Sequence, residues 1–147
     1  MSRQRLGLEH EELTYEIIGA FREVYYALGS QFLESVYVAA LVRELRIRRL
    51  TVEREVSARI YYKGVEIAWQ RLDLVVEGKV LVEVKSGTQL PIAAVRQIEN
   101  YLHATPLEIG LLLHFGSEPK PYRFYAPNNR KPNLEASPRE AVSPIKT

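Results

Sequence analysis

The stretch Arg71–Lys85, which reads RLDLVVEGKVLVEVK, decides the fold because it contains two apolar strands joined by a turn. Gly78 can adopt a positive φ angle and marks the turn, and the valines and leucines on either side favour extended strands. Asp73, Glu83 and Lys85 interrupt these apolar strands. Charged groups are costly in apolar surroundings unless another group neutralises them. The stretch therefore predicts a hairpin that carries a polar site.

The length of the turn determines which of these charged side chains face each other. A three-residue loop centred on Gly78 places Asp73 directly opposite Glu83, with Cβ atoms about 4.5–5.5 Å apart. Lys85 then projects from the same face as Glu83, because side chains alternate along a strand. A two-residue loop would instead place Asp73 opposite Val82. We favour the three-residue loop, in which two opposed carboxylates share a divalent cation and a lysine ammonium lies beside a phosphate.

An Asp on one strand followed by Glu-x-Lys on the next resembles the active site of the PD-(D/E)XK nuclease superfamily. Two further segments match that superfamily in the same order along the chain. Leu28–Tyr37, LGSQFLESVY, resembles the signature of its GxxExxY group, and residues 96–102, RQIENYL, resemble the Gln-bearing helix that follows the active strand. Gln31 stands where the name of the group places glycine, which affects the turn before the helix. The resemblance spans about Leu13 to Tyr125.

The resemblance implies a metal-dependent phosphodiesterase that hydrolyses DNA, or alternatively RNA. Asp73 and Glu83 would hold Mg²⁺, or Mn²⁺ in its place, together with the carbonyl oxygen of Val84. Glu34 would complete the metal shell directly or through a water molecule. Lys85 would orient the attacking water or stabilise the negative charge that develops on the phosphate.

Two further groups of residues extend this implied site. Gln97 would position phosphate or water, and Tyr101, its i+4 neighbour on a helix, would support Gln97. Arg43, Arg46 and Arg49 recur one helical turn apart and would contact phosphates beside the site. A solvated basic helix face with acidic partners is an equally good interpretation of these three arginines.

Each candidate residue also has an ordinary structural interpretation. Asp73 alone reads as a surface acid near a turn, and Glu34 reads as an acid on a helix surface. Glu83 and Lys85 could form an exposed ion pair that contributes little to stability. Only the joint occurrence of these residues, in order and on the expected elements, favours catalysis. Two alternatives stay open: a nucleic-acid-binding module without turnover, and an interaction protein such as a homodimer.

The periodicity of apolar residues predicts an α/β fold for the rest of the chain. Helices are expected at about 11–28, 32–48 and 91–103, and strands at about 52–62, 65–76, 80–85, 109–113 and 122–125. This order predicts a mixed central sheet flanked by helices, which is the restriction-endonuclease-like core that the resemblance implies. Thr88 is expected to cap the third helix. The strand at 65–76 is long enough to need a bend, and Trp69 on it is expected to pack.

Composition limits the remaining classes of function. With 147 residues the chain is expected to form one domain, at 1–126, followed by a proline-containing disordered tail at 127–147. No cysteine is present, so disulfides and thiolate metal sites are excluded, and the three histidines lack the spacing of a zinc site. A net charge of +2 does not by itself advertise nucleic-acid binding. No apolar run suggests a membrane span or a signal peptide, and a cytoplasmic location is expected.

Overall fold

The structure is a computed structural model that describes residues 10–131 and 142–144. Its elements, in chain order, are α1 (Glu11–Leu28), α2 (Glu34–Ile47), β1 (Val52–Tyr62), β2 (Val65–Val76), β3 (Val80–Ser86), α3 (Ile92–Ala104), β4 (Ile109–Phe115), β5 (Pro119–Tyr125), the 3₁₀ helix η1 (Asn128–Arg130) and β6 (Val142–Pro144). The strands form one sheet in the order β5-β4-β3-β2-β1-β6. Only β3 and β4 are parallel among its paired strands. This mixed sheet flanked by helices confirms the predicted fold class.

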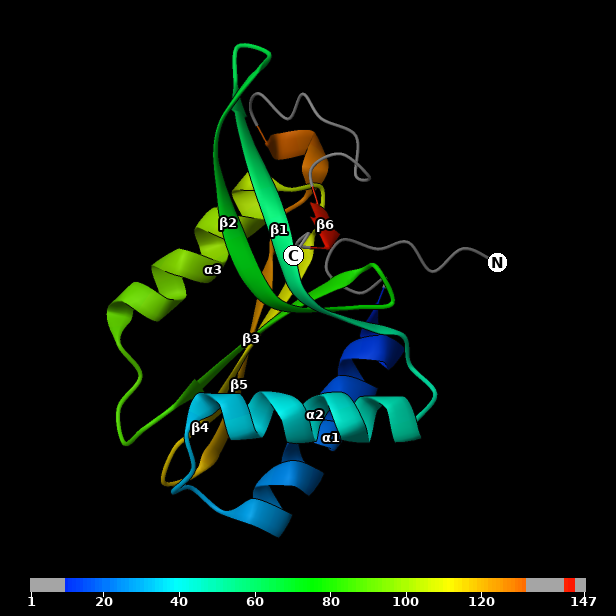
Figure 1. Ribbon diagram of the computed structural model, residues 1–147, viewed down its shortest axis with the longest axis vertical. Coiled ribbons are helices and arrows are strands. Elements are labelled where there is room, and N and C mark those ends of the chain that lie inside the picture. Colours follow the sequence, from blue (N-terminus) through cyan, green and yellow to red (C-terminus); the bar gives the residue numbers. More distant parts are fainter. Residues whose placement is uncertain (1–9, 132–141, 145–147) are drawn as a thin grey trace.

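One face of the sheet is covered by α1 and α2, which lie together and apart from α3 (Figure 1). Apolar side chains at helical spacing, such as Phe21 on α1 and Leu41 on α2, are fully buried against Val82, Val84 and Phe115 of β3 and β4. Each fully buried side chain of this kind stabilises the fold by about 1.5–3 kcal/mol. The periodicity that predicts these two helices therefore also identifies the face that they bury.

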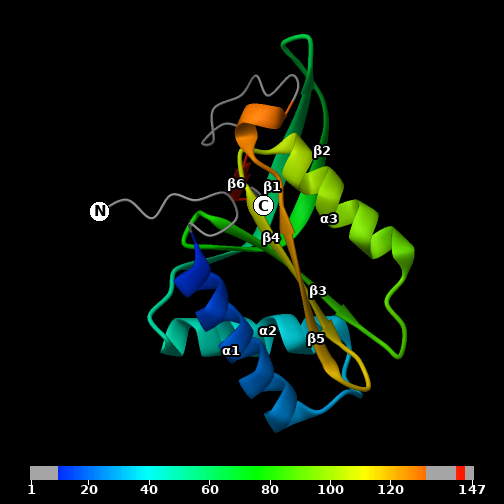
Figure 2. The same cartoon turned by 180° about the vertical axis from the view of Figure 1, so that it is seen from behind.

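The opposite face of the sheet is covered by α3, as the reverse view shows (Figure 2). Ile98 and Leu102 of α3 pack on Leu81 of β3 and Leu112 of β4. Leu81 alternates along β3 with the valines that contact α1 and α2. Because alternate side chains of a strand share a face, residues 83 and 85 of β3 project toward α3. The acid and the lysine of the predicted site thus lie on the α3 side.

The strands β1 and β2 bend where Asp73 interrupts the apolar pattern. Leu74 packs beneath α1 and α2, whereas Leu72 packs beneath α3, although a regular strand would place both on one face. On β1, Glu55 lies opposite this break, between the paired positions 54 and 56, and has a φ angle of 50°. This conformation is uncommon for a residue other than glycine and sharpens the bend. The long strand, which was expected to bend, is therefore irregular at Asp73, and its register with β1 shifts again between Ile60 and Tyr61.

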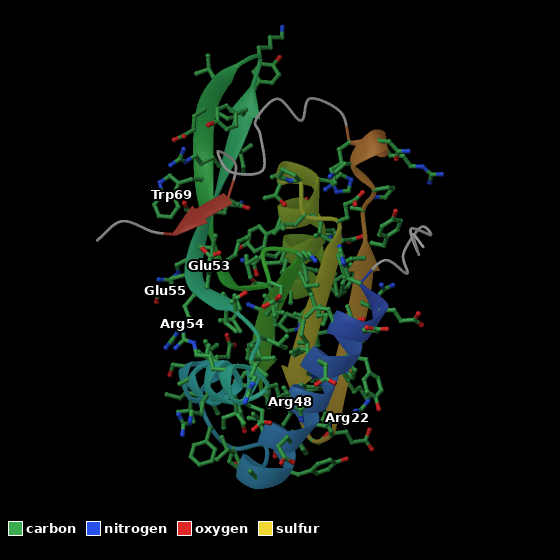
Figure 3. All side chains as sticks on the ribbon, turned by 90° about the vertical axis from the view of Figure 1, so that its right-hand side faces the viewer. Arg22, Arg48, Glu53, Arg54, Glu55 and Trp69 are labelled. Atoms are coloured by element: carbon green, nitrogen blue, oxygen red, sulfur yellow. The ribbon has the colours of Figure 1, made fainter. Side chains whose placement is uncertain are left out.

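Beyond this bend the β1–β2 hairpin extends past the helices (Figure 1). Trp69 was expected to pack, but the structure corrects this expectation because its side chain is 56% exposed. Figure 3 shows Trp69 pointing away from α3, on a face of the hairpin that no helix covers. Val65 and Ile67 of β2 are likewise exposed. The alternation that identified the strand gives no information about whether another layer covers it.

The beginning of α3 also differs from the expectation. Pro91 occupies the N-cap position in an extended conformation, and the expected cap residue, Thr88, lies in the preceding loop. Proline has no N–H group and a fixed φ angle, so it suits the boundary between a loop and a helix. Thr88 is three residues too early to accept a hydrogen bond from the first turn of α3.

Part of the predicted disordered tail is ordered against the domain. After η1, the buried side chain of Lys131 donates hydrogen bonds from Nζ to the carbonyl oxygens of Thr105, at 2.7 Å, and Leu107, at 2.8 Å. Val142–Pro144 pairs with β1 as the strand β6. Prolines and polar residues thus did not prevent local order at these positions. The other residues of the predicted tail, 132–141 and 145–147, lie outside the described residues, and the domain boundary at 126 stays a prediction.

Candidate active site

The hairpin between β2 and β3 brings Asp73 and Glu83 face to face. Val76 pairs with Val80, which confirms the three-residue loop and the predicted register. At Asp73 and Glu83 the two strands are joined by hydrogen bonds from backbone N–H groups to the carboxylates, in place of the usual hydrogen bonds between backbone groups. The backbone N–H of Asp73 donates to Glu83 Oε1 at 3.0 Å, and the backbone N–H of Val84 donates to Asp73 Oδ2 at 2.9 Å. Both carboxyl groups are therefore fixed in orientation.

Burial makes Glu83 a weaker acid than an ordinary glutamate. Its side chain is only 4% exposed, whereas Asp73 is partly buried. Loss of hydration, followed by the nearby negative charge of Asp73, raises the pKa of Glu83 to about 8, and the Lys85 ammonium opposes this shift. At neutral pH and without a cation, Glu83 holds its proton. Such perturbed acids are characteristic of functional sites.

The donor set was tested for its fit to a divalent cation. Within the described residues no group of three or more His, Cys, Asp or Glu side chains could hold a metal ion, so Glu34 does not join Asp73 and Glu83. The pair itself fits, because Mg²⁺ accepts one or two carboxylates and keeps several water molecules. A cation would also relieve the repulsion between the two ionised acids. The expected role of the Val84 carbonyl stays a prediction, and the structure shows only that its N–H orients Asp73.

A cavity of about 470 Å³ is lined by Lys85, which shares a face of β3 with Glu83, although neither Asp73 nor Glu83 is among the lining residues. Three predicted site residues line it from three elements: Glu34 begins α2, Lys85 lies near the end of β3, and Gln97 lies on α3. The complete lining consists of Glu34, Gln70, Lys85, Ser86, Gln89, Pro91, Ala93, Ala94, Gln97 and Asn100. The structure therefore brings together residues that are far apart in the sequence, as the family resemblance implies.

Tyr101 is hydrogen-bonded to one of the residues that line the cavity. Gln97 Nε2 donates a hydrogen bond to Tyr101 Oη at 2.6 Å, so these i, i+4 residues interact as expected. Burial is the main reason that the pKa of Tyr101 is raised, and the negative charge of Glu83 raises it further, with a smaller effect from Asp73. The hydroxyl of Tyr101 thus interacts with Gln97 and lies within the electrostatic influence of both acids, and its supporting role stays a prediction.

The GxxExxY-like segment positions Glu34 through its tyrosine. The ring of Tyr37 stacks on Phe115 with 4.0 Å between the ring centroids, and the side chain is fully buried. Its hydroxyl donates to the carbonyl oxygen of Gly29 and accepts a hydrogen bond from the N–H of Phe32. These bonds fix the loop that enters α2, whose first residue is Glu34. Tyr37 therefore determines where Glu34 enters the cavity.

The arginines that were expected to contact phosphates do not line the cavity. They lie near the C-terminal end of α2, and the helix of 14 residues spans about 20 Å from Glu34 to that end. Arg43 and Arg49 are exposed, and Arg46 Nη2 lies 3.5 Å from the carbonyl oxygen of Val52. The three were expected to share a face of the second helix, but α2 ends at Ile47 and Arg49 has a φ angle of 65°, so helical spacing does not extend to Arg49. A role in phosphate binding stays a prediction.

Arg48, adjacent to this stripe, has a structural role instead. It links α2 to α1 in the region that Figure 3 labels. Its Nη1 lies 3.1 Å from Glu16 Oε1 on α1, and its Nε lies 3.0 Å from Glu44 Oε2 on α2. The hydrogen bond to Glu44 is the main cause that raises the pKa of Arg48. Part of the basic end of α2 therefore stabilises the helix pair.

Several residues near the site had no distinguishing signal in the sequence. Gln70, Gln89 and Asn100 line the cavity from β2, a loop and α3, and no local pattern connects them. His114 lies beside Lys85 across the parallel pair of β3 and β4 and is buried. Its Nε2 donates to the carbonyl oxygen of Gly87 at 2.8 Å, and this bond holds the loop that follows Lys85.

The mixed sheet, with an acidic pair and a lysine at the end of its central hairpin, defines a restriction-endonuclease-like protein. The family model of the PD-(D/E)XK nuclease superfamily matches residues 11–124, and the chain therefore belongs to this superfamily. Members of the superfamily are generally nucleases and typically use divalent metal ions. No curated protein and no solved structure is significantly similar to the chain. None of the helices within residues 10–131 combines the length and apolarity required to cross a lipid bilayer.

Proposed function

We propose that the protein is a Mg²⁺-dependent nuclease that hydrolyses phosphodiester bonds, with DNA preferred over RNA. The observation that carries this proposal is the oriented pair of Asp73 and the buried Glu83, on the strand that also brings Lys85 to the cavity lined by Gln97 and Glu34. The energetic cost of burying Glu83 beside a second acid is explained if a cation binds there. A purely structural hairpin end would not require this arrangement.

The roles of the residues follow from their positions. Asp73 and Glu83 hold the divalent cation, which when bound supplies Lewis-acid activation of water and of the phosphoryl oxygen. Lys85 places an ammonium beside the reacting phosphate and stabilises the developing negative charge or orients the nucleophile. Gln97, held by Tyr101, donates from its amide to phosphate or water. Glu34, which lines the cavity from the start of α2, acts through water.

The finer classification rests on the sequence. We infer membership of the GxxExxY group from residues 28–37, in which Tyr37 and Glu34 occupy the expected positions relative to each other. A cytoplasmic location is proposed because the chain contains no cysteine, which fits a reducing compartment. Preference for DNA over RNA is carried over from the resemblance.

The direct test is a cleavage assay with plasmid, linear DNA, single-stranded DNA and RNA, each with Mg²⁺, Mn²⁺ or EDTA. We expect metal-dependent cleavage that falls by about 10²–10³-fold in Lys85→Ala, since a group that stabilises transition-state charge is typically worth this much. Lys120→Ala, at an exposed position of β5, is a matched control and should retain activity. Absence of metal-dependent cleavage, or full activity of Lys85→Ala, would reject the proposal.

A second candidate function is self-association, which stays a prediction of the sequence. Large apolar side chains are exposed near the tip of the β1–β2 hairpin, where Tyr62 pairs with Val65 and where Ile67 and Trp69 follow on β2 across an irregularity in the strand register. Such surfaces frequently mark interaction sites. Sedimentation measurements over a range of protein concentrations test for a homodimer, and a monomer at the highest concentration would exclude it.

A further inference from the structure

The cavity at Lys85 has a lining that is largely uncharged. Glu34 and Lys85 are its only charged lining residues within the described chain, and their formal charges cancel. Surfaces that bind phosphate chains are rich in lysine and arginine, because each contact releases counterions. This lining instead contains four carboxamides, contributed by Gln70, Gln89, Gln97 and Asn100. The lining chemistry therefore fits a neutral, hydrogen-bonding group better than it fits a second phosphate.

Gln70 stands out among these carboxamides. It belongs to β2 and shares the α3 face with Leu72, two residues further along the strand. Its Oε1 is buried and has no hydrogen-bond partner within the described residues. A buried acceptor without a partner is destabilising and requires an explanation. The terminal torsion of a glutamine is broad, so the carboxamide can turn its oxygen toward a donor in the cavity.

The remaining lining is apolar and comes from the start of α3. Pro91, Ala93 and Ala94 contribute to the wall of the cavity, and Ala94 also packs in the core beneath α3. A volume of about 470 Å³ lies within the range of ligand sites, which is about 300–1,000 Å³. Carboxamides pair with the hydrogen-bonding edges of nucleobases, and apolar surfaces accept their flat faces.

We propose that this cavity receives one unstacked nucleobase of the substrate, recognised by the carboxamide of Gln70. The inference rests on the proposed function and names its substrate class: single-stranded or locally unpaired nucleic acid. A base inside a duplex is stacked and paired, and its extrusion into a pocket costs a few kcal/mol. An unpaired base avoids this cost and offers the amino or imino donor that Gln70 Oε1 lacks.

Binding without turnover tests the proposal. The full chain in EDTA is titrated into three labelled probes: a short single-stranded DNA, the same sequence as a duplex, and a chain of abasic residues. We expect the single strand to bind about tenfold more tightly than either of the others. Gln70→Leu, which is similar in shape, should weaken binding of the single strand about tenfold and leave binding of the abasic chain unchanged.

Thermal unfolding separates a recognition role from a structural role. Because Gln70 Oε1 has no partner in the protein, Gln70→Leu removes a buried unsatisfied acceptor and should raise the Tm by about 2–4 °C. A structural carboxamide would give the opposite result. Gln31→Leu is the matched control, since Gln31 is exposed and does not line the cavity. This variant should change neither the Tm nor the affinity for the single strand.

Equal affinity for the single strand and the abasic chain would overturn the inference, as would a Gln70→Leu protein with lower Tm and unchanged binding. The proposed function fails in a different way. Base-dependent binding that is sensitive to Gln70→Leu, without any metal-dependent cleavage, would reject the nuclease and support the base site. If the protein cleaves DNA in a metal-dependent way but binds the abasic chain as tightly as the single strand, only the proposed base site would be rejected.

Discussion

Glu83 shows how burial sets the chemistry of a single residue. The same side chain in an unfolded chain ionises near its ordinary pKa of 4.5, but in the fold the pKa is raised to about 8, first by burial and then by Asp73. Each unit of such a shift corresponds to about 1.4 kcal/mol. The fold thus keeps one acid of the pair neutral until a cation or a high pH removes its proton.

A stability measurement without metal checks this acidity. As the pH rises from 5 to 8, the unfolded chain loses the Glu83 proton while the native protein retains it, so native stability should fall. We expect urea unfolding in EDTA to show a loss of at least about 2 kcal/mol over this range. Glu83→Gln should abolish the contribution, because glutamine does not titrate and still accepts the hydrogen bond from Asp73. The exposed Glu99→Gln serves as the control.

The pH range of this measurement ends at 8 because of Lys131. Burial lowers the pKa of Lys131 to about 8, and Glu108 partly opposes this shift. Between pH 8 and its ordinary pKa of 10.5, the unfolded chain binds the lysine proton more strongly than the native protein does. Native stability from Lys131 therefore rises with pH in that range, opposite in sign to the effect of Glu83.

For Glu83, a wild-type stability profile that is flat from pH 5 to 8 would contradict a side chain that stays neutral in the native protein.

At the scale of elements, the loop after β3 is held from β4. A Cβ atom added at Gly116 would lie 2.8 Å from His114 Cε1 and 3.2 Å from the carbonyl oxygen of Gly87. Because Gly116 has no side chain, the His114 ring has room to donate its hydrogen bond to Gly87. This bond fixes the segment after β3, and Ser86 and Gln89 on either side of Gly87 line the cavity. The sequence did not predict the contact between His114 and Gly87, because these residues are 27 positions apart and no local pattern connects them.

A double-mutant cycle tests this contact. We expect Gly116→Ala to destabilise the protein by about 1–3 kcal/mol, as overpacking does, but to cost less in a His114→Ala background, where the ring is absent. Hydrogen exchange of residues 87–89 should accelerate in both single variants. Gly19→Ala is the control for hydrogen exchange, since its added Cβ would lie 2.9 Å from Arg48 Nη1, away from this loop, and should leave exchange of residues 87–89 unchanged. Fully additive effects of the two substitutions would show that the ring and the glycine are not coupled.

The elements themselves were largely predictable, and the reason lies in the pattern of burial. The three-residue loop was the favoured alternative and the structure confirms its register, but the apolar pattern could not exclude the two-residue loop, because Val75 and Leu81 are buried on one face and Val76 and Val82 on the other. Patterns within one element gave no information about neighbouring layers. This explains the exposure of Trp69, the distance of Arg46 from the cavity and the cavity contribution of Gln70.

At the scale of the whole molecule, the site joins both layers of the fold. Glu34 comes from the helix pair on one face, Gln97 from α3 on the other, and Asp73 and Glu83 from the sheet between them. The resemblance to the nuclease superfamily predicted that these residues lie near one another. The sequence pattern alone showed only that their chemistry is compatible with such a site. A ligand held at this junction would contact both layers and should stabilise the complete domain.

Metal addition and removal should therefore change global stability. A cation needs Glu83 ionised, so at pH 6 it must displace a proton from a group whose pKa is about 8. We expect Mg²⁺ or Mn²⁺ to raise the Tm more at pH 8 than at pH 6, with an effect of about 2.7 kcal/mol at 100 times the dissociation constant. EDTA should reverse the change, and Asp73→Asn should remove it. An increase in Tm of equal size at both pH values, or in Asp73→Asn, would indicate a different binding site.

The central claim is that Asp73 and Glu83 together hold a divalent cation, and one crystallographic measurement tests it most directly. Crystals soaked in Mn²⁺ at pH 8 should show an anomalous peak bonded to a carboxylate oxygen of each residue, with Lys85 beside it. Absence of a peak between these two side chains, while manganese occupies another acidic position, would contradict the claim.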